Sequence, residues 1–224
     1  METRRHALNT CEFIEEHKLI VVCRKIYGDD LEKLAAALLK GGVRLMEVTL
    51  DQQDPDCIAK TCAAIRMLSE LYGDGLLVGA GTVLKEDQVD AAFRAGAKYI
   101  VSPNYNPMVI KRTKELGLVS IPGAMTPTEI LAAHDCGADF VKLFPSTALG
   151  FKYIEDILAP ITHVKLIATG GVNEENFGQY LDLGFVGAGV GGWLTDRKLI
   201  ASGNFEELTR RAEAFCRIAR RERR

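Results

Sequence analysis

Two ionisable side chains lie inside apolar stretches of this sequence, and together they suit imine and proton-transfer chemistry. Lys142 stands in the middle of DFVKLFPS, and Glu47 stands in the middle of RLMEVTL. Burial lowers the pKa of a lysine, so that part of the population carries a neutral amine able to attack a ketone. A nearby carboxylate can then move protons between the successive intermediates. The pair therefore indicates a Schiff-base enzyme.

The same two residues have a structural interpretation that the sequence leaves open. They could form a buried ion pair, or Lys142 could extend its ammonium to the rim of the fold. Desolvating two ions costs several kcal/mol for each, so such a pair would be a poor source of stability. Lys142 is embedded within its apolar run, whereas the other lysines near predicted strands stand at strand ends: Lys25, Lys98 and Lys165.

Glycines gather in two further segments, ATGG from Ala168 and GAGVGG from Gly187. Gly-rich turns that lead toward a helix let backbone amides approach a phosphate group. Glycines also permit tight turns without any ligand, so one such segment alone would be weak evidence. Two of them at neighbouring strand ends favour a phosphate site. With the lysine, they predict a phosphorylated keto compound as substrate.

The elements that must position these residues recur along the chain. A helical segment ends at a glycine, and a short, almost continuously apolar run follows; glycines 96, 117 and 137 mark three such points. A glycine there suits a left-handed helix C-cap, and continuously apolar strands suit a parallel sheet covered on both faces. The runs predict eight strands: 19–24, 45–50, 76–81, 99–103, 118–122, 140–144, 165–169 and 186–189.

Eight βα units in 224 residues predict an α/β protein with a closed (β/α)8 barrel, the TIM barrel. An open doubly wound sheet is the alternative, although such sheets usually stop at about five or six strands. Residues 1–18 are expected to form an extra N-terminal helix that plugs or flanks the bottom of the barrel. No Pro/Gly/Ser-rich linker divides residues 1–224, so we expect one domain, with its functional groups at the carboxyl ends of the strands.

Composition excludes several classes of partner. The 28 basic and 30 acidic residues nearly balance, which argues against nucleic acid and membrane surfaces. No apolar run approaches the ~18–20 residues that span a bilayer, and the charged N-terminus does not resemble a secretory signal, which predicts a cytoplasmic protein. The six cysteines and four histidines lack metal-ligand spacing, so we expect reduced thiols and no metal.

Six motifs occur in the order GGVRLMEVTL, VGAGTVL, SPNYNP, IPGAMTPTEI, VKLFPS and ATGGV. From about Leu19 to Trp193 the chain resembles the 2-keto-3-deoxy-6-phosphogluconate (KDPG) and 4-hydroxy-2-oxoglutarate (KHG) aldolases. The resemblance implies a class I lyase of the Entner–Doudoroff type. It further implies a homotrimer of (β/α)8 barrels that needs no metal or organic cofactor. The reaction implied is reversible cleavage to pyruvate and an aldehyde such as glyceraldehyde 3-phosphate.

The resemblance also assigns roles to single residues. Lys142 corresponds to the imine-forming lysine, and Glu47 to the general acid/base that acts through a bound water. Thr82 is expected near the pyruvyl end, and Pro103 and Phe144 are expected to wall the site. The phosphate end is expected to be lined by Thr169, Gly170, Gly171, Gly191 and Gly192.

Two positions depart from the family pattern. Many members continue EVTL with an arginine that holds the substrate carboxylate, but here the residue is Asp51. Arg24 resembles an arginine of a sister branch that acts on the galactonate-derived substrate, and we expect it to take over this role. A surface position past the strand end is the alternative for Arg24. Members often carry Gly-Ser after the eighth strand, whereas Gly191-Gly192 here lacks the hydroxyl donor.

Two functions other than aldol cleavage stay open at this stage. In a phosphate-binding isomerase or synthase without a covalent intermediate, Lys142 would be an electrostatic clamp. In a non-catalytic sugar-phosphate sensor, the departures at Asp51 and Gly192 would mark lost activity. The sequence also does not choose between the phosphogluconate and phosphogalactonate epimers, or between them and 4-hydroxy-2-oxoglutarate.

Overall fold

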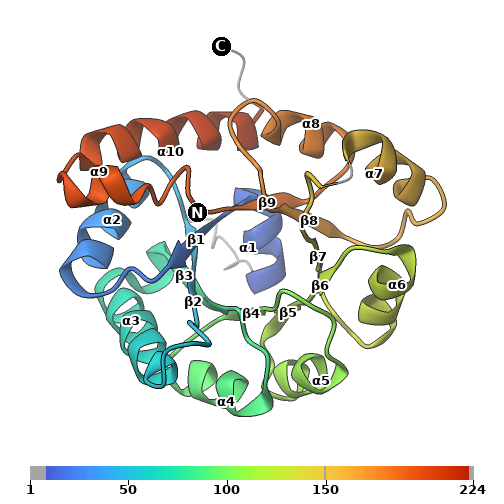
Figure 1. The fold of residues 1–224 in the computed structure, drawn as a ribbon, viewed down its shortest axis with the longest axis horizontal. Coiled ribbons are helices and arrows are strands. Elements are labelled where there is room, and N and C mark those ends of the chain that lie inside the picture. Colours follow the sequence, from blue (N-terminus) through green and yellow to red (C-terminus); the bar gives the residue numbers. More distant parts are fainter. Residues whose placement is uncertain (1–8, 149, 222–224) are drawn as a thin grey trace, which may run out of the picture.

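A ring of helices surrounds a parallel sheet in the computed structural model, which describes residues 9–148 and 150–221 (Figure 1). The sheet order is β5-β4-β3-β2-β1-β9-β8-β7-β6. The strands are β1 (Leu19–Arg24), β2 (Leu45–Thr49), β3 (Leu77–Gly81), β4 (Tyr99–Val101), β5 (Val119–Ile121), β6 (Gly123–Ala124), β7 (Val141–Leu143), β8 (Leu166–Thr169) and β9 (Gly187–Val190).

The two ends of this strand order, β5 and β6, lie on either side of Pro122; β5 falls within the predicted strand 118–122, and β6 follows it. β5 pairs with β4, and β6 pairs with β7. Proline has no amide hydrogen, but the Pro122 carbonyl accepts a hydrogen bond of 2.8 Å from the Lys142 amide. The Ser120 carbonyl likewise accepts from the Phe140 amide at 3.3 Å. These bonds join β7 to the segment that contains β5 and β6 and close the sheet, which confirms the predicted eight-unit barrel.

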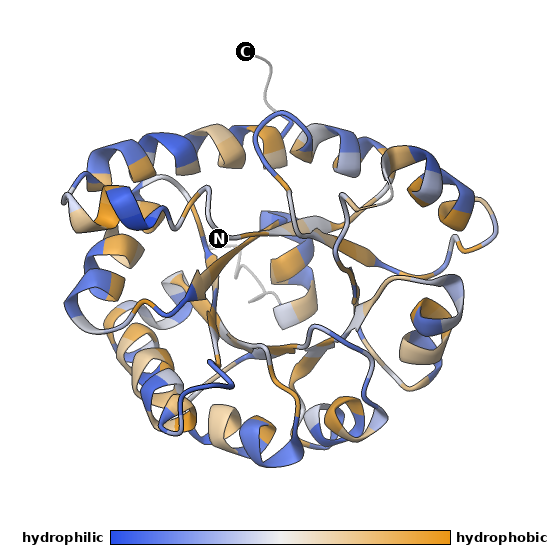
Figure 2. Ribbon diagram, viewed as in Figure 1, coloured by the Kyte–Doolittle hydropathy of each residue, from blue (hydrophilic) through white to orange (hydrophobic). Residues whose placement is uncertain are grey.

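The helices alternate with the strands and cover the outside of the barrel (Figure 1). Figure 2 shows apolar residues on the strands and mixed polar and apolar residues on the helices, as amphipathic helices require. None of the described helices combines the length and apolarity needed to cross a membrane. They are α1 (Thr10–His17), α2 (Gly28–Lys40), α3 (Cys57–Tyr72), α4 (Glu86–Arg94), α5 (Pro107–Glu115), α6 (Pro127–Asp135), α7 (Gly150–Leu158), α8 (Phe177–Asp182), α9 (Arg197–Ala201) and α10 (Phe205–Ala219), with a 3-10 turn at Gly73–Gly75.

The extra helix predicted before the first strand is α1, which Figure 1 shows inside the ring of strands. A capping box between Asn9 and Glu12 begins this helix. Ile14, only 1% exposed, joins the apolar cluster of the barrel interior. Residues 1–8, which the same prediction includes, lie outside the described residues. The helix therefore plugs the barrel bottom, and the treatment of 1–224 as one domain stays a prediction.

An apolar layer inside the barrel forms the floor beneath the inward side chain of Glu47. The fully buried Tyr99 donates its hydroxyl hydrogen to the Met46 carbonyl at 2.7 Å. Its ring lies directly across Gly79, where any Cβ atom would overlap it. Phe140 belongs to the same interior cluster. Glycine at position 79 thus lets a large aromatic ring separate the site above from the plug helix below.

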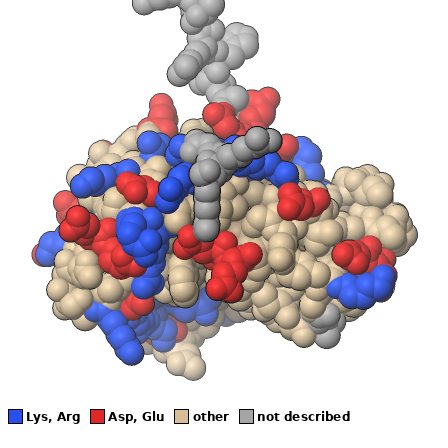
Figure 3. Space-filling view, turned by 90° about the horizontal axis from the view of Figure 1, so that it is seen from above, with Lys and Arg blue, Asp and Glu red and all other residues tan. Residues whose placement is uncertain are grey.

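The surface charges are mixed rather than segregated by sign. On the face that Figure 3 shows, Lys and Arg side chains are interspersed with Asp and Glu. This pattern agrees with the net charge of −2 and gives this face no extended field of one sign. None of the six cysteines, all of which the structure describes, forms a disulfide.

Candidate active site

A cavity of about 870 Å³ opens at the carboxyl ends of β1, β7, β8 and β9. The fold brings together residues that lie up to 168 positions apart in the sequence. Eight residues predicted from the sequence line the cavity: Arg24, Lys142, Phe144, Thr169, Gly170, Gly171, Gly191 and Gly192. Among the described residues, no group of three His, Cys, Asp or Glu side chains could hold a metal ion. Lys142 and Arg24 bring an amine and a guanidinium into the cavity.

Lys142 lies on β7 and points into the barrel, because its neighbours Val141 and Leu143 pack on the helix side. The residue is 7% exposed, and its Nζ lies 4.8 Å from the centroid of the Phe144 ring. Burial lowers the pKa of Lys142, the Arg24 charge acts in the same direction, and the Glu47 charge opposes both. The amine beside the Phe144 ring therefore loses its proton more easily than the amine of an exposed lysine does.

Glu47 lies on β2 with its carboxylate against Gly81 of β3. It is 3% exposed, and a Cβ atom at position 81 would come within 2.6 Å of its Oε1. Burial raises the pKa of Glu47, while the charges of Lys142 and Arg24 lower it by less. A carboxyl group shifted in this way holds its proton to a higher pH than an exposed glutamate does, which suits a general acid/base.

Lys142 and Glu47 form no direct ion pair. Within the described residues, neither side chain donates or accepts a hydrogen bond, and the two interact only through their charges. The structural interpretation as a buried ion pair is therefore not what the fold builds.

Arg24 ends β1 beside Thr49 of β2 and lines the cavity. Its charge is felt by both Lys142 and Glu47, and no described carboxylate pairs with it. Asp51 cannot serve this end of the cavity, since it bonds to Lys25 Nζ at 2.6 Å. The alternative for Arg24 was a surface position past the strand end. Arg24 is indeed exposed, and it lines the cavity.

Three predicted residues lie outside the lining of the cavity: Glu47, Thr82 and Pro103. Thr82 follows Gly81 in a left-handed conformation (φ 57°), and its carbonyl accepts a hydrogen bond from Gln52 Nε2 at 2.7 Å. The Pro103 backbone packs tightly on Gly123, at the point where the barrel closes. The structure thus places Thr82 and Pro103 outside the cavity wall.

The glycine turn after β8 has the conformation expected for an anion site. Gly170 and Gly171 have φ of 92° and 77°, a region that suits glycine. The Gly170 carbonyl accepts hydrogen bonds from Ser146 Oγ at 3.1 Å and Thr147 Oγ1 at 3.2 Å. Within the described chain, the amides of both glycines and of Gly192 lack an internal acceptor. These amides are free to bind a phosphate.

Sequence reasoning missed two cations at this end of the cavity, Arg197 and Lys198. They belong to the first turn of α9, whose N-cap residue Asp196 accepts hydrogen bonds from the amides of Lys198 and Leu199. The segment TDRK carries the signal, because an aspartate followed by a helical run is a typical N-cap. Gly192 lacks the serine hydroxyl of the family pattern, but the same cavity is lined by two positive side chains, Arg197 and Lys198.

Comparison with known proteins agrees with this geometry. Residues 11–211 match the family described as KDPG and KHG aldolase. The chain is 36% identical to the 2-dehydro-3-deoxy-6-phosphogalactonate aldolase of Escherichia coli K12, over 90% of this chain and 94% of that protein. It is also 36% identical to the 2-dehydro-3-deoxy-phosphogluconate aldolase of Treponema pallidum, over 92% and 96%.

Solved structures show the same fold. The structure described as native KDPGal aligns with a TM-score of 0.80 at 35% identity, over 91% of this chain and 94% of that chain. The KDPG aldolase of Legionella pneumophila aligns with a TM-score of 0.81 at 27% identity, over 91% and 96%. The chain therefore belongs to the KDPG and KHG aldolase family, and it is an aldolase, a carbon–carbon lyase.

Proposed function

We propose that this aldolase is a class I enzyme that cleaves a phosphorylated 2-keto-3-deoxy sugar acid to pyruvate and an aldehyde such as glyceraldehyde 3-phosphate. The observation that carries the proposal is the unpaired, desolvated amine of Lys142 at the cavity, with Glu47 close enough to influence its pKa. Support comes from the Legionella relative, whose structure is described as holding pyruvate as a covalent carbinolamine intermediate. Aldolases of this family form an imine and use no cofactor.

The proposed reaction begins when the neutral Lys142 amine attacks the keto carbon C2. The resulting carbinolamine loses its hydroxyl as water, with Glu47 supplying the proton, and leaves a protonated imine. Glu47 then takes the proton of the C4 hydroxyl, directly or through a water. The C3–C4 bond breaks, its electron pair flows into the imine to form an enamine, and the aldehyde leaves. Protonation at C3 and hydrolysis of the imine release pyruvate and restore the amine.

We assign the substrate's C1 carboxylate to Arg24. This residue brings a cation into the cavity near Lys142, and the aspartate at position 51 is engaged by Lys25. A guanidinium binds a carboxylate through two parallel hydrogen bonds. Phe144 would form the apolar wall at this end, whereas Thr82 and Pro103, which lie outside the lining, are given no direct contact with the substrate.

We assign the phosphate to the end of the cavity that the turns after β8 and β9 line. The free amides of Gly170, Gly171 and Gly192, together with Gly191 and Thr169, would surround it. Arg197 and Lys198 would add charge. Two cations and several amides suit a dianion better than a neutral hydroxyl.

The test is reduction with borohydride in the presence of pyruvate, followed by mass spectrometry. We expect one stable adduct, on Lys142, and none in Lys142→Met. The matched control is Lys165→Met, which removes a lysine that is paired with Glu15 at the barrel's surface and should leave the adduct intact. An adduct on another lysine, or none, would contradict the proposal. An isomerase or synthase would lose ligand affinity in Lys142→Met without ever forming an adduct, and a sensor would show no turnover in a coupled pyruvate assay.

Assembly and substrate are proposed from family membership. We infer a cytoplasmic homotrimer, which light scattering would test against three times the 24.6 kDa chain mass. The names of the two relatives given above refer to different epimers. Each relative is 36% identical to this chain, so sequence identity does not choose between the epimers. Comparison of kcat/KM for the two epimers and for 4-hydroxy-2-oxoglutarate would identify the preferred substrate.

A further inference from the structure

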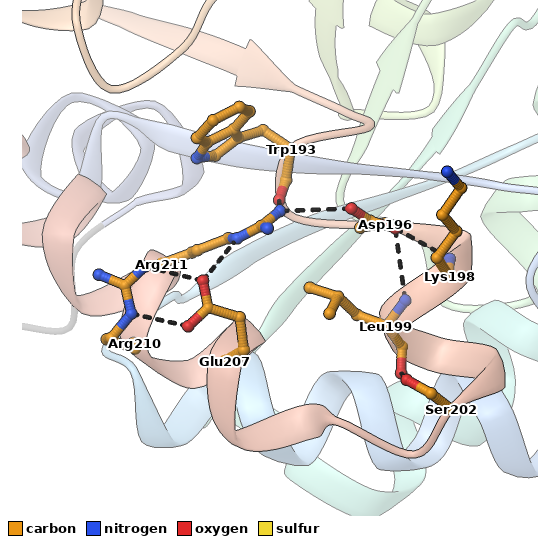
Figure 4. Close-up of polar contacts among 8 residues, drawn as sticks. All are labelled: Trp193, Asp196, Lys198, Leu199, Ser202, Glu207, Arg210 and Arg211. Atoms are coloured by element: carbon orange, nitrogen blue, oxygen red, sulfur yellow. Dashed lines mark hydrogen bonds and ion pairs between the residues drawn. The ribbon is translucent and has the colours of Figure 1, made fainter.

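Arg211 belongs to the outer helix α10 but reaches inward to the loop after β9, as Figure 4 shows. Its side chain is only 18% exposed, which is low for an arginine of the outer ring. The loop that it contacts supplies a whole wall of the cavity: Trp193, Thr195, Asp196, Arg197 and Lys198. Arg211 is absent from that lining, so any effect on the substrate has to pass through the loop.

The first contact fixes the start of the loop. Arg211 Nη1 donates a hydrogen bond of 3.0 Å to the Trp193 carbonyl, and its guanidinium lies 5.0 Å from the centroid of the indole ring. One side chain therefore holds both the backbone and the ring of Trp193. Trp193 follows Gly191 and Gly192, two glycines with little restraint of their own.

The second contact fixes the direction of α9. Asp196 accepts hydrogen bonds at its Oδ1 from the amides of Lys198 (2.9 Å) and Leu199 (3.3 Å). Its Oδ2 lies 3.5 Å from Arg211 Nη1 (Figure 4). The residue that begins the helix carrying Arg197 and Lys198 is thus tied to Arg211. Arg197 in turn donates from Nη2 to the Arg24 carbonyl at 3.2 Å.

The third contact anchors Arg211 itself. Its Nε donates to Glu207 Oε1 at 3.0 Å, and Glu207 also accepts two hydrogen bonds of 2.7 Å from Arg210. The two arginines lower the pKa of Glu207 to about 2, so this anchor stays charged at all ordinary pH values. With Nε held by Glu207, the Nη1 group is directed to the loop.

We propose that Arg211 is a positioning residue that holds the Trp193–Lys198 loop so that Arg197 and Lys198 face the phosphate end of the cavity. This positioning gives the enzyme a preference for phosphorylated over unphosphorylated sugar acids. The inference rests on the proposed function. Without Arg211 the Trp193 carbonyl and the Asp196 carboxylate lose their ties to α10, and the free energy of holding them in place is taken from phosphate binding. Lys142 and Glu47, which lie on strands, keep their places.

The test compares Arg211→Met with the control Arg210→Met. Arg210 is the neighbouring arginine on the same helix and shares Glu207, but its described bonds do not reach the loop. Substrates are the phosphorylated sugar acid and the same carbon chain without phosphate. For Arg211→Met we expect KM for the phosphorylated substrate to rise about tenfold, with kcat/KM for the unphosphorylated one within about twofold. Arg210→Met should change neither value.

A binding measurement that needs no turnover is available, because Trp193 is the only tryptophan of the chain. Titration with inorganic phosphate should change its fluorescence in the wild type and in Arg210→Met, and Arg211→Met should bind about tenfold more weakly. Equal affinities, or no saturable change in the wild type, would overturn the role given to Arg211.

The outcomes separate this inference from the proposed function. Failure of the pyruvate adduct in the wild type would refute the Schiff-base proposal, whereas an adduct with an unchanged substrate preference in Arg211→Met would refute only the positioning role. Should Arg211→Met fail to fold, Glu207→Gln and Arg211→Lys decide instead. The first loosens the anchor, and the second keeps the charge without the planar fork. An unchanged preference in both would overturn the inference.

Discussion

The Lys142 amine and the Glu47 carboxyl are both buried at the top of the barrel, yet no hydrogen bond or ion pair joins them among the described residues. Their pKa values are displaced toward one another, because burial lowers that of the lysine and raises that of the glutamate. A pair of groups arranged in this way can exchange protons with a substrate placed between them.

The first prediction concerns the pH dependence of imine formation. The charge of Glu47 raises the pKa of Lys142, so Glu47→Gln should lower it further. The rate of trapping with pyruvate and cyanoborohydride rises with pH as the free amine forms, and in Glu47→Gln this rise should move to lower pH. Turnover should fall by about 10²–10⁴-fold, because the proton carrier is gone. A rise that moves to higher pH would contradict the assigned coupling.

The second prediction concerns stability. Because the pKa of Lys142 lies below its ordinary value of 10.5, the unfolded chain binds more protons between the folded pKa and 10.5, so stability rises with pH across that window. With the pKa of Glu47 above 4.5, the folded chain binds more protons, so stability falls as pH rises from 4.5 to the folded pKa. Near neutral pH both groups therefore destabilise the fold.

The double variant Lys142→Met/Glu47→Gln should accordingly be more stable than the wild type by about 1–4 kcal/mol at neutral pH. The gain should shrink as the pH is raised toward 10.5, where the lysine no longer contributes. Urea unfolding followed by circular dichroism at several pH values measures it. The control is Lys165→Met, which removes an exposed lysine paired with Glu15. A less stable double variant would show that the two groups support the fold.

The third prediction concerns Arg24. Arg24→Ala should raise KM for every pyruvyl acid by at least about tenfold, phosphorylated or not, since each loses a charge-assisted bidentate partner. It should also raise the pKa of Lys142, because the Arg24 charge now lowers it. Lys25→Ala is the matched control, as Lys25 is the next residue, pairs with Asp51 and does not line the cavity. An unchanged KM in Arg24→Ala would remove this residue from the substrate carboxylate.

How far the sequence could predict this molecule depends on the range of the interactions involved. The barrel follows from local signals, because helix-ending glycines such as Gly96 (φ 97°) and Gly137 (φ 98°) and apolar strands recur with every unit. The break at Pro122 escaped prediction, since it depends on which neighbours β5 and β6 find.

The site shows the same division between local and distant causes. Lys142 stood out because a buried charge is anomalous in any fold. Arg197 and Lys198 did not, because their placement depends on a short helix whose N-cap residue, Asp196, contacts the distant Arg211. Thr82, expected near the pyruvyl end, lies outside the cavity lining, and its carbonyl accepts a hydrogen bond from the Gln52 side chain.

The last prediction concerns Gly81, which packs against the Glu47 carboxylate. In Gly81→Ala the new Cβ would come within 2.6 Å of Oε1 and 2.9 Å of Thr49 Cγ2, so the carboxylate has to move. A shift of about 1 Å in a catalytic group costs up to about 10²-fold in kcat. The pyruvate adduct on Lys142 should still form, which separates displacement of Glu47 from loss of the lysine. Gly75→Ala is the control, because nothing lies within 4 Å of a Cβ there. Wild-type turnover in Gly81→Ala would show that the position of the Glu47 carboxylate does not limit the reaction.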